Sequence, residues 1–299
     1  MHKSGYVAIV GLPNSGKSTL LNVLLGQKLA ITNTKPQTTR KRILGILTEK
    51  DYQIIFLDTP GIINPSYLLQ EKMMGDVEQS FNDADIILLL IDVAGDPRGK
   101  KSLNHEFVKM SLGRKNKITL LILNKVDLIQ QEEATDLLNY FEGLKLFNSI
   151  VLVSALHRFN LKKLIETVVE NLPEGPNFYP DDIIADENER FFVSEIIREK
   201  ILELYHEEIP YSCEVMITEF KERESAKDFI SAEIVVERES QRKIIIGKDG
   251  SSVKKLGKIA REAVEEFLRN EVYLDLRVKV RNKWRSDENW LKKFGYGNK

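Results

Sequence analysis

The chain has 299 residues, about twice the length of a typical domain, which predicts two domains that each bury a core. With 42% hydrophobic and 30% charged residues, the composition excludes a disordered or low-complexity chain. The net charge of −1 conceals an acidic block at 181–240, with 7 basic and 18 acidic side chains, and a basic block at 241–299, with 16 and 8. A basic block favours a polyanionic partner, although a solvated surface is the simpler interpretation of a charge run.

The single cysteine, Cys213, excludes an internal disulfide and a multi-thiolate metal site, as is usual in a reducing compartment. The longest apolar run, at 86–91, is far shorter than the roughly 20 residues that a membrane-spanning helix needs. The amino terminus has no apolar stretch long enough for the core of a signal peptide. We therefore expect a soluble, cytoplasmic protein.

Residues 1–172 alternate between β-branched apolar runs and segments with helical spacing. Continuous apolar strands that alternate with helices along the chain are typical of a mainly parallel sheet, which helices cover on both faces. We therefore expect a doubly wound α/β domain. The predicted strands are 6–10, 52–57, 86–91, 118–123 and 150–153, and the predicted helices are 18–25, 105–112 and 161–169.

A phosphate-binding loop is predicted between the first strand and the first helix. Its pattern is G-x-x-x-x-G-K-S, in Gly11-Leu12-Pro13-Asn14-Ser15-Gly16-Lys17-Ser18. Backbone N–H groups and the helix dipole converge on an anion in such a loop, while the Lys17 ammonium reaches the terminal phosphates and the Ser18 hydroxyl binds Mg²⁺. The flanking strand and helix favour a nucleotide site over an ordinary glycine-rich turn.

A second phosphate-side motif follows the strand at 52–57, in Asp58-Thr59-Pro60-Gly61. A D-x-x-G pattern is expected about once per chain by chance, so its position at a strand end carries the argument. There the Asp58 carboxylate is suited to hold Mg²⁺, and the Gly61 N–H is suited to reach a γ-phosphate.

The base is predicted from the motif Asn124-Lys125-Val126-Asp127, which follows the strand at 118–123. The Asp127 carboxylate can accept from the N1–H and the exocyclic amine of guanine, whereas adenine presents an acceptor at its ring nitrogen. A buried mismatch of this kind discriminates by roughly 10⁴-fold. A backbone N–H at Ser154 or Ala155 is expected to reach the guanine oxygen. The motif therefore predicts GTP and GDP as ligands, with a helix cap as the alternative role of Asp127.

The four motifs, in this order and spacing, resemble those of the translation-factor-related class of GTPases. The resemblance implies that a threonine after the first helix completes the Mg²⁺ shell, and of Thr38 and Thr39 we favour Thr39. Ras-like enzymes carry a glutamine where this chain has Ile62. The chain is similar here to hydrophobic-substituted GTPases, some of which use K⁺ held by a P-loop asparagine. We predict slow, cation-assisted hydrolysis by Lys17, Thr39, Gly61 and Asn14.

Asn14 also has a simpler interpretation, as a residue that shapes the loop by hydrogen bonding.

After the first domain, residues 172–180 contain three prolines and a glycine, which neither a helix nor a central strand tolerates, so we place a linker at 173–188. Residues 189–299 are predicted to form an α+β domain, because the order of elements changes. That order is a helix at 191–205, strands at 214–220 and 230–237, a short helix, a helix at 252–268 and a strand at 272–280.

A glycine-bounded turn, Gly247-Lys248-Asp249-Gly250, precedes the helix at 252–268. The order of elements around it resembles a bacterial-type (type II) KH module, in which a G-x-x-G turn lets the backbone of single-stranded RNA approach and an apolar groove takes about four bases. The neighbouring basic side chains fit attraction to phosphates. An ordinary helix–turn–helix with a glycine cap is the alternative. The residues predicted to bind RNA are Lys243, Ile246, Gly247, Lys248, Asp249, Gly250 and Lys254.

Together, the GTPase motifs at 1–172, the linker and the KH module at 189–299 resemble the Era GTPases over nearly the whole chain. The less generic stretches 172–176, 195–200 and 209–212 strengthen the resemblance, and Ser15 departs from the small apolar residue usual in that loop. The resemblance implies a bacterial factor that binds 16S ribosomal RNA near its 3′ end, helps to mature the 30S particle and associates peripherally with the inner membrane. We expect a monomer.

Two other functions fit parts of the sequence. The first is a non-enzymatic RNA-binding module whose nucleotide site only stabilises the fold. The second is a GTPase that assembles on membranes through its basic carboxy-terminal block, although the G-x-x-G context favours RNA.

Overall fold

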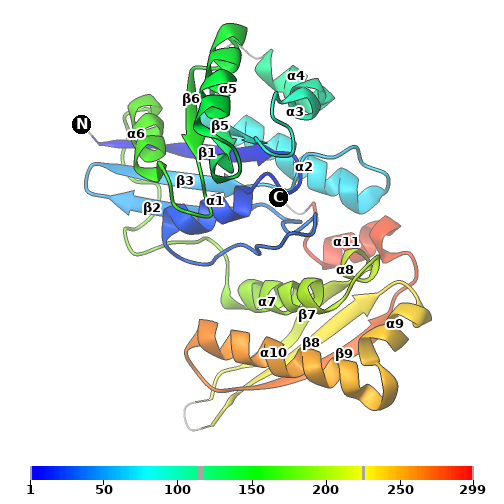
Figure 1. Ribbon diagram of the computed structural model, residues 1–299. Coiled ribbons are helices and arrows are strands. Elements are labelled where there is room, and N and C mark those ends of the chain that lie inside the picture. Colours follow the sequence, from blue (N-terminus) through cyan, green and yellow to red (C-terminus); the bar gives the residue numbers. More distant parts are fainter. Residues whose placement is uncertain (1, 114–116, 224–225, 298–299) are drawn as a thin grey trace. The chain divides into compact units, whose positions relative to one another are not determined.

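The computed structural model describes residues 2–113, 117–223 and 226–297. The chain divides into two compact units, which are described separately here (Figure 1). The first unit extends to Asp186 and the second begins at Glu187, with Ser66–Lys72 assigned to the second.

The first unit contains a six-stranded sheet in the order β2-β3-β1-β4-β5-β6. Only β2 is antiparallel to its neighbour, so the predicted mainly parallel α/β sheet is confirmed. The sequence analysis missed β2, an edge strand that follows a polar loop. The strands are β1 (Lys3–Gly11), β2 (Ile43–Glu49), β3 (Tyr52–Asp58), β4 (Ile86–Asp92), β5 (Ile118–Asn124) and β6 (Ser149–Val153).

Helices cover both faces of this sheet (Figure 1). On one face, Val77, Phe81, Val108 and Phe141 pack against the strands. These side chains come from α2, α4 and α5, while α1 and α6 lie on the other face. The helices are α1 (Lys17–Leu25), α2 (Leu68–Asp83), α3 (Lys100–Asn104), α4 (Glu106–Leu112), α5 (Gln131–Leu144) and α6 (Leu161–Asn171), with a short 3₁₀ turn, η1 (Val126–Leu128).

Because β1, β3, β4, β5 and β6 are parallel, their carboxyl ends meet at one edge of the sheet. In open α/β sheets that edge is where ligands bind. The strands end there at Gly11, Asp58, Asp92, Asn124 and Val153. The motifs of the sequence analysis therefore converge in space although they are far apart in the chain.

The proline-rich segment packs along the first unit as far as Asp186. The Ser4 hydroxyl donates to the Pro176 carbonyl at 2.6 Å. Gln53, which is fully buried, accepts from the N–H groups of Phe178 and Tyr179 at 2.8 and 3.0 Å. The Ile46 N–H, on the open edge of β2, donates to the Ile184 carbonyl at 2.7 Å. The segment predicted as a linker is thus tied to three strands.

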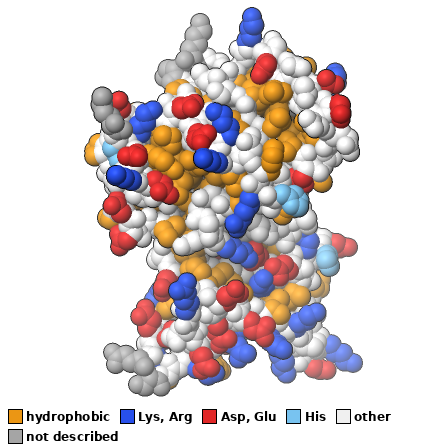
Figure 2. Space-filling view, turned by 60° about the vertical axis from the view of Figure 1, so that its left-hand side comes forward, with side chains coloured by type: hydrophobic (Ala, Val, Ile, Leu, Met, Phe, Trp, Pro, Cys, Tyr) orange, Lys and Arg blue, Asp and Glu red, His pale blue; other side chains and the backbone are white. Residues whose placement is uncertain are grey.

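The second unit contains a three-stranded sheet in the order β7-β8-β9, with β7 antiparallel and β9 parallel to β8. Helices pack on one face of it, and this order confirms the predicted type II KH topology. The face of the second unit that Figure 2 shows carries interspersed acidic and basic side chains. The elements are α7 (Glu189–Leu204), α8 (Ile209–Ser212), β7 (Glu214–Lys221), β8 (Asp228–Val236), α9 (Glu239–Ile246), η2 (Lys248–Gly250), α10 (Ser251–Leu268), β9 (Val272–Val280), η3 (Trp284–Ser286) and α11 (Glu288–Lys293).

Candidate functional site

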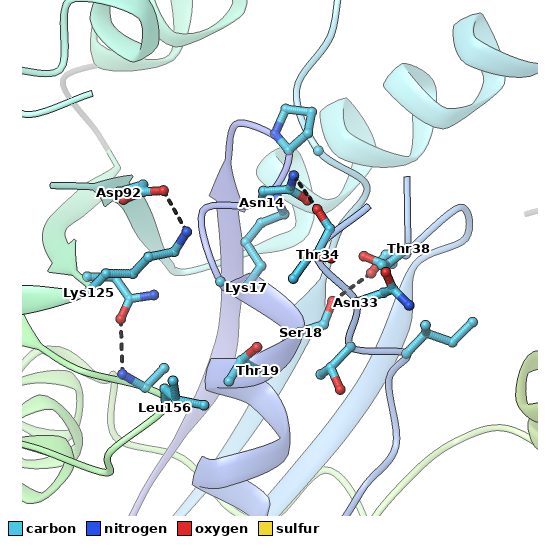
Figure 3. A pocket seen from close by; sticks show the side chains of 18 of the residues that line it. Asn14, Lys17, Ser18, Thr19, Asn33, Thr34, Thr38, Asp92, Lys125 and Leu156 are labelled. Atoms are coloured by element: carbon cyan, nitrogen blue, oxygen red, sulfur yellow. Dashed lines mark hydrogen bonds and ion pairs between the residues drawn. The ribbon is translucent and has the colours of Figure 1, made fainter. Parts of the chain in front are cut away.

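A cavity of about 600 Å³ lies at the carboxyl edge of the large sheet (Figure 3). We call it the P-loop pocket. The predicted site residues that line it are Pro13, Asn14, Gly16, Lys17, Ser18, Thr39, Gly61, Asn124, Lys125, Asp127 and Ala155.

The Lys17 side chain is buried at the start of α1. Its ammonium donates to the carbonyls of Gly11 and Leu12 at 3.1 and 3.0 Å. Burial lowers the pKa of Lys17 to about 8, an effect that the neighbouring Asp58 partly offsets. A cation held within the loop, among backbone groups at a helix amino terminus, makes this end of the pocket suited to phosphate.

Three oxygen-bearing side chains meet beside Lys17. The hydroxyls of Ser18 and Thr39 lie 2.7 Å apart, and they donate to the same Asp58 oxygen, Oδ2, at 2.9 and 3.0 Å. Burial raises the pKa of Asp58 to about 6, although Lys17 and the two hydroxyls oppose the shift. The other carboxylate oxygen, Oδ1, is buried and has no hydrogen-bond partner among the described residues. An all-oxygen donor set with an unpaired carboxylate oxygen fits Mg²⁺.

The segment after Asp58 lies against the P-loop. The Ile62 N–H donates to the Gly11 carbonyl at 3.0 Å. A Cβ on Gly61 would lie only 2.8 Å from the Pro13 nitrogen, so this contact requires glycine. The Ile62 side chain is buried in the core rather than in the pocket. A hydrophobic residue at this position is therefore explained by packing, and it offers no polar group to a water molecule.

Asn14 connects the P-loop with the loop that carries Thr39. Its amide donates to the Thr34 carbonyl at 2.9 Å, as Figure 3 shows. Asn14 has a left-handed backbone, with φ of 63°, which asparagine tolerates better than most residues. The Asn14 side chain therefore does form a hydrogen bond, but to the loop that carries Thr39 rather than within the P-loop.

Asn124 braces the other end of the pocket. Its amide nitrogen donates to the Ser15 carbonyl at 2.8 Å, and its oxygen accepts from the Ala155 N–H at 3.0 Å. A Cβ on Gly16 would collide with that amide nitrogen. Asn124 therefore holds the P-loop and the 154–156 turn in register.

Lys125 and Asp127 flank the space beyond Asn124. The Lys125 ammonium lies 2.6 Å from Asp92 Oδ2 (Figure 3), and Asp127 Oδ2 lies 3.7 Å from His157 Nε2. Leu156, which is 71% exposed, also lines the pocket here and gives this space, which we call the base slot, an apolar wall. A carboxylate beside an apolar wall suits a flat base that donates hydrogen bonds at one edge.

Other predicted nucleotide residues support the pocket from behind it. Ser15 and Ser154 are buried, and the Thr59 hydroxyl donates to the Ile9 carbonyl at 2.7 Å. Gly11 and Leu12 act through the carbonyls that Lys17 contacts, and neither Pro60 nor Val126 lines the cavity. The sequence analysis missed several lining residues because they lie outside the motifs, in loops and in α1, β4 and η1. They are Thr19, Ile31, Thr32, Asn33, Thr34, Gln37, Asp92, Leu128 and Leu156, whereas Thr38, the threonine not favoured for Mg²⁺, also lines the pocket.

In the second unit, the Gly247–Gly250 turn joins α9 to α10. Gly247, Asp249 and Gly250 all have positive φ, at 72°, 52° and 74°. A Cβ on Gly247 would lie 2.6 Å from the Ser252 Cβ, whereas one on Gly250 would meet open space. Glycine at 247 is therefore required by close approach as well as by backbone conformation.

A groove of about 360 Å³ runs between α10 and β9, and we call it the α10–β9 groove. Its walls combine cationic and apolar side chains, which suits the phosphates and bases of a single strand. Of the seven residues predicted to bind RNA, only Lys254 lines it. The spacing along α10 shows one helix face, but nothing in the sequence pairs that face with β9. The lining residues are Val253, Lys254, Gly257, Lys258, Arg261, Leu274 and Leu276.

Within the part of the chain that the structure describes, no helix is both long and apolar enough to cross a bilayer. The same residues contain no cluster of three histidine, cysteine, aspartate or glutamate side chains arranged to hold a metal ion.

Comparisons with known proteins agree with both units. The family described as 50S ribosome-binding GTPase matches residues 6–125, and the family described as KH domain matches residues 208–285. GTPase Era of Syntrophus aciditrophicus is 45% identical over 297 residues, which cover 99% of this chain and 96% of that protein.

Two solved structures match nearly the whole chain at 40% identity. One is Era in complex with MgGDPNP and nucleotides 1506–1542 of 16S ribosomal RNA, with a TM-score of 0.93 and 99% of both chains covered. The other is an Era variant of Aquifex aeolicus bound to GDP·AlF₄⁻, with a TM-score of 0.91 and coverage of 98% of this chain and 99% of that chain.

Proposed function

The chain belongs to the Era family of GTPases, and from this premise we propose that its GTP hydrolysis controls binding to 16S ribosomal RNA during assembly of the 30S subunit. The observation that carries the proposal is the meeting of Thr39 with Ser18 and Asp58. This contact ties the loop that carries Thr39 to the residues around the terminal phosphate and the metal. Because hydrolysis changes the charge there, it can change how well the loop is ordered, and a switch requires such a link.

The phosphate end of the P-loop pocket binds the nucleotide through Gly11–Ser18, with the Lys17 ammonium against the terminal phosphates. Ser18, Thr39 and Asp58 hold Mg²⁺, which neutralises phosphate charge when it is bound. The Gly61 N–H faces the γ-phosphate, while Thr59 and Pro60 shape that loop. The unpaired Oδ1 of Asp58 supports this assignment.

Guanine occupies the base slot beside Asp127, which accepts two hydrogen bonds from its edge. Asn124 holds the base slot together, Lys125 and Leu156 cover the base, and the 154–155 turn donates a backbone N–H to its oxygen. The support is the contact of Asn124 with Ala155 and the position of Asp127 in the pocket wall.

Hydrolysis is assisted by K⁺ held in part by Asn14. The support is that the Ile62 side chain is buried in the core and that the Asn14 amide donates to the Thr34 carbonyl. Phosphate release should therefore be several-fold faster in K⁺ than in Na⁺ at equal ionic strength. Equal turnover in both salts would remove K⁺ from the account and leave Asn14 as a loop-shaping residue.

RNA binds along the Gly247–Gly250 turn and into the α10–β9 groove. Lys243, Lys248, Lys254 and Arg261 attract its phosphates, while Ile246, Leu274 and Leu276 contact its bases. The support is the combination of cationic and apolar walls in the groove. Because the similar Era structure holds nucleotides 1506–1542, the 3′ region of 16S RNA is the proposed target.

We place the protein in the cytoplasm as a monomer on 30S precursors, with a peripheral contact to the inner membrane that its family suggests. The absence of a spanning helix from the described residues is compatible with such a contact.

The test combines two assays on the full-length protein. Multiple-turnover phosphate release from GTP is measured with and without 30S particles, and binding of the RNA of nucleotides 1506–1542 is measured for the wild type and for a Lys248→Ala, Asp249→Ala variant. We expect weaker RNA binding by the variant and unchanged hydrolysis in the absence of RNA. If the protein bound GTP but released no phosphate, the alternative of a non-enzymatic RNA-binding module would be favoured. If the variant and the wild type bound the RNA equally well, the Gly247–Gly250 turn would have no role in RNA binding.

A further inference from the structure

Tyr205 lies immediately after α7, and its ring is buried in the core of the second unit. Its hydroxyl lies 3.0 Å from the Ile245 carbonyl oxygen and 2.9 Å from the Ser252 hydroxyl. A phenol has one proton, and the carbonyl can only accept, so Tyr205 donates to Ile245 and accepts from Ser252. Burial raises the pKa of Tyr205, which keeps that proton in place.

The two partners bracket the Gly247–Gly250 turn. Ile245 lies in the last turn of α9, where carbonyls have no partner within the helix, and Ser252 lies in the first turn of α10. Between them the backbone takes the left-handed region at Asp249, which L-residues adopt reluctantly. One hydroxyl from the residue that follows α7 therefore fixes the two helix ends that this strained turn connects.

We propose that Tyr205 is a positioning residue that orders the Gly247–Gly250 turn in advance for the RNA backbone. The inference rests on the proposed RNA binding, which it deepens by naming a residue that touches no RNA. A turn already held in its bound conformation loses less conformational freedom when RNA binds, so affinity rises without an added contact. Without the hydroxyl, the ends of α9 and α10 are no longer joined at this point.

The chain offers a matched control. Tyr296 is also buried in the second unit, and its hydroxyl donates to Glu214 Oε2 at 2.7 Å, at the start of β7. Tyr205→Phe and Tyr296→Phe each remove one buried phenolic hydroxyl, but only the first removes a bond to the helices around the turn. Ser252→Ala removes the hydrogen bond between Ser252 and Tyr205 while it keeps the Tyr205 side chain. It is the test variant if Tyr205→Phe folds poorly.

The experiment measures the affinity of each full-length variant for the RNA of nucleotides 1506–1542. It also measures amide exchange of Gly250, whose N–H donates to the Gly247 carbonyl at 3.3 Å, in the RNA-free protein. We expect Tyr205→Phe and Ser252→Ala to bind RNA about 5-fold more weakly and to exchange the Gly250 amide faster, with Tyr296→Phe within 2-fold of the wild type. The salt dependence of binding should stay unchanged, because no phosphate contact is removed.

Wild-type affinity in Tyr205→Phe would overturn the inference, and so would an equal loss in Tyr296→Phe, which would indicate general destabilisation. If the wild type itself did not bind the RNA, the proposed function would fail. The Gly250 exchange would then decide by itself whether Tyr205 orders the turn.

Discussion

At the scale of single residues, the Asp58 carboxylate joins the parts of the proposed phosphate site. One of its oxygens accepts from both Ser18 and Thr39, and the other is buried without a partner among the described residues. A buried, unpaired carboxylate oxygen is unfavourable unless a ligand uses it. The pKa of Asp58 at about 6 reflects the same burial.

Thr39→Ala is expected to weaken binding of the Mg²⁺ complex of GDPNP about 10-fold, because a metal and loop contact is lost, and to leave GDP affinity nearly unchanged. Thr38→Ala is the matched control, since Thr38 is the adjacent threonine and also lines the pocket. Calorimetry with both nucleotides checks the expectation. An equal loss in Thr38→Ala would show that the assignment of Thr39 is wrong.

Asp127→Asn is expected to transfer preference from GTP to XTP. Xanthine presents a carbonyl where guanine presents its exocyclic amine, so an amide pairs where a carboxylate did. Roughly 10²-fold or more should be lost in GTP affinity. A competition assay between the two nucleotides measures the change, and unaltered selectivity would contradict the assignment of Asp127 to the base.

At the scale of elements, the two glycines of the Gly247–Gly250 turn have similar φ but differ in the space that a side chain would find. Gly247→Ala would force its Cβ against Ser252, whereas Gly250→Ala would meet only backbone strain of about 1 kcal/mol. We expect more than a 10-fold loss of RNA affinity for the first variant and a smaller loss for the second, measured with the same RNA. The reverse order of effects would show that the close approach at Gly247 is not what shapes the turn.

Gln53→Leu tests how the proline-rich segment is held to the sheet. The variant leaves the N–H groups of Phe178 and Tyr179 without their acceptor, which should lower the free energy of unfolding by roughly 2–4 kcal/mol and speed proteolysis within 177–182. Gln130→Leu, at an exposed position before α5, is the matched control. Unchanged urea unfolding and proteolysis in Gln53→Leu would contradict this role.

Some of these elements could be predicted because their local pattern is sufficient. The buried parallel strands are continuous apolar runs, and β9 was predicted with its observed bounds. By contrast, the sequence analysis missed β2, α2 and α5. The edge strand β2 contains Gly45, and the amphipathic helices α2 and α5 carry many polar residues, so none of them stands out as an apolar run. The order of the proline-rich segment depends on Gln53, more than a hundred residues earlier, which no local pattern reveals.

The candidate sites divide in the same way. Motifs predicted the P-loop, Asp58 and Asp127 because each lies at a strand end, and parallel strands bring such ends together. The Asp92 contact with Lys125 and the pairing of α10 with β9 arise only from tertiary packing. Sequence spacing alone therefore missed Asp92, Arg261 and Leu276.

At the scale of the whole molecule, one chain combines a nucleotide pocket with a basic carboxy-terminal block. Residues 241–299 carry 16 basic and 8 acidic side chains, whereas 181–240 carry 7 and 18. The RNA is therefore expected to meet the later block, and its binding should weaken as salt rises. A switch requires that RNA affinity differ between the two nucleotide states, because a ligand shifts an equilibrium only by its differential affinity for the states.

The most direct test is the affinity of the full-length protein for the RNA of nucleotides 1506–1542, measured at one salt concentration with Mg²⁺ and either GDPNP or GDP. The account predicts binding at least 5-fold tighter with GDPNP, because the proposed contact of Thr39 with the Mg²⁺ complex favours the triphosphate state. Equal affinity in the two states would contradict the claim that the nucleotide controls RNA binding.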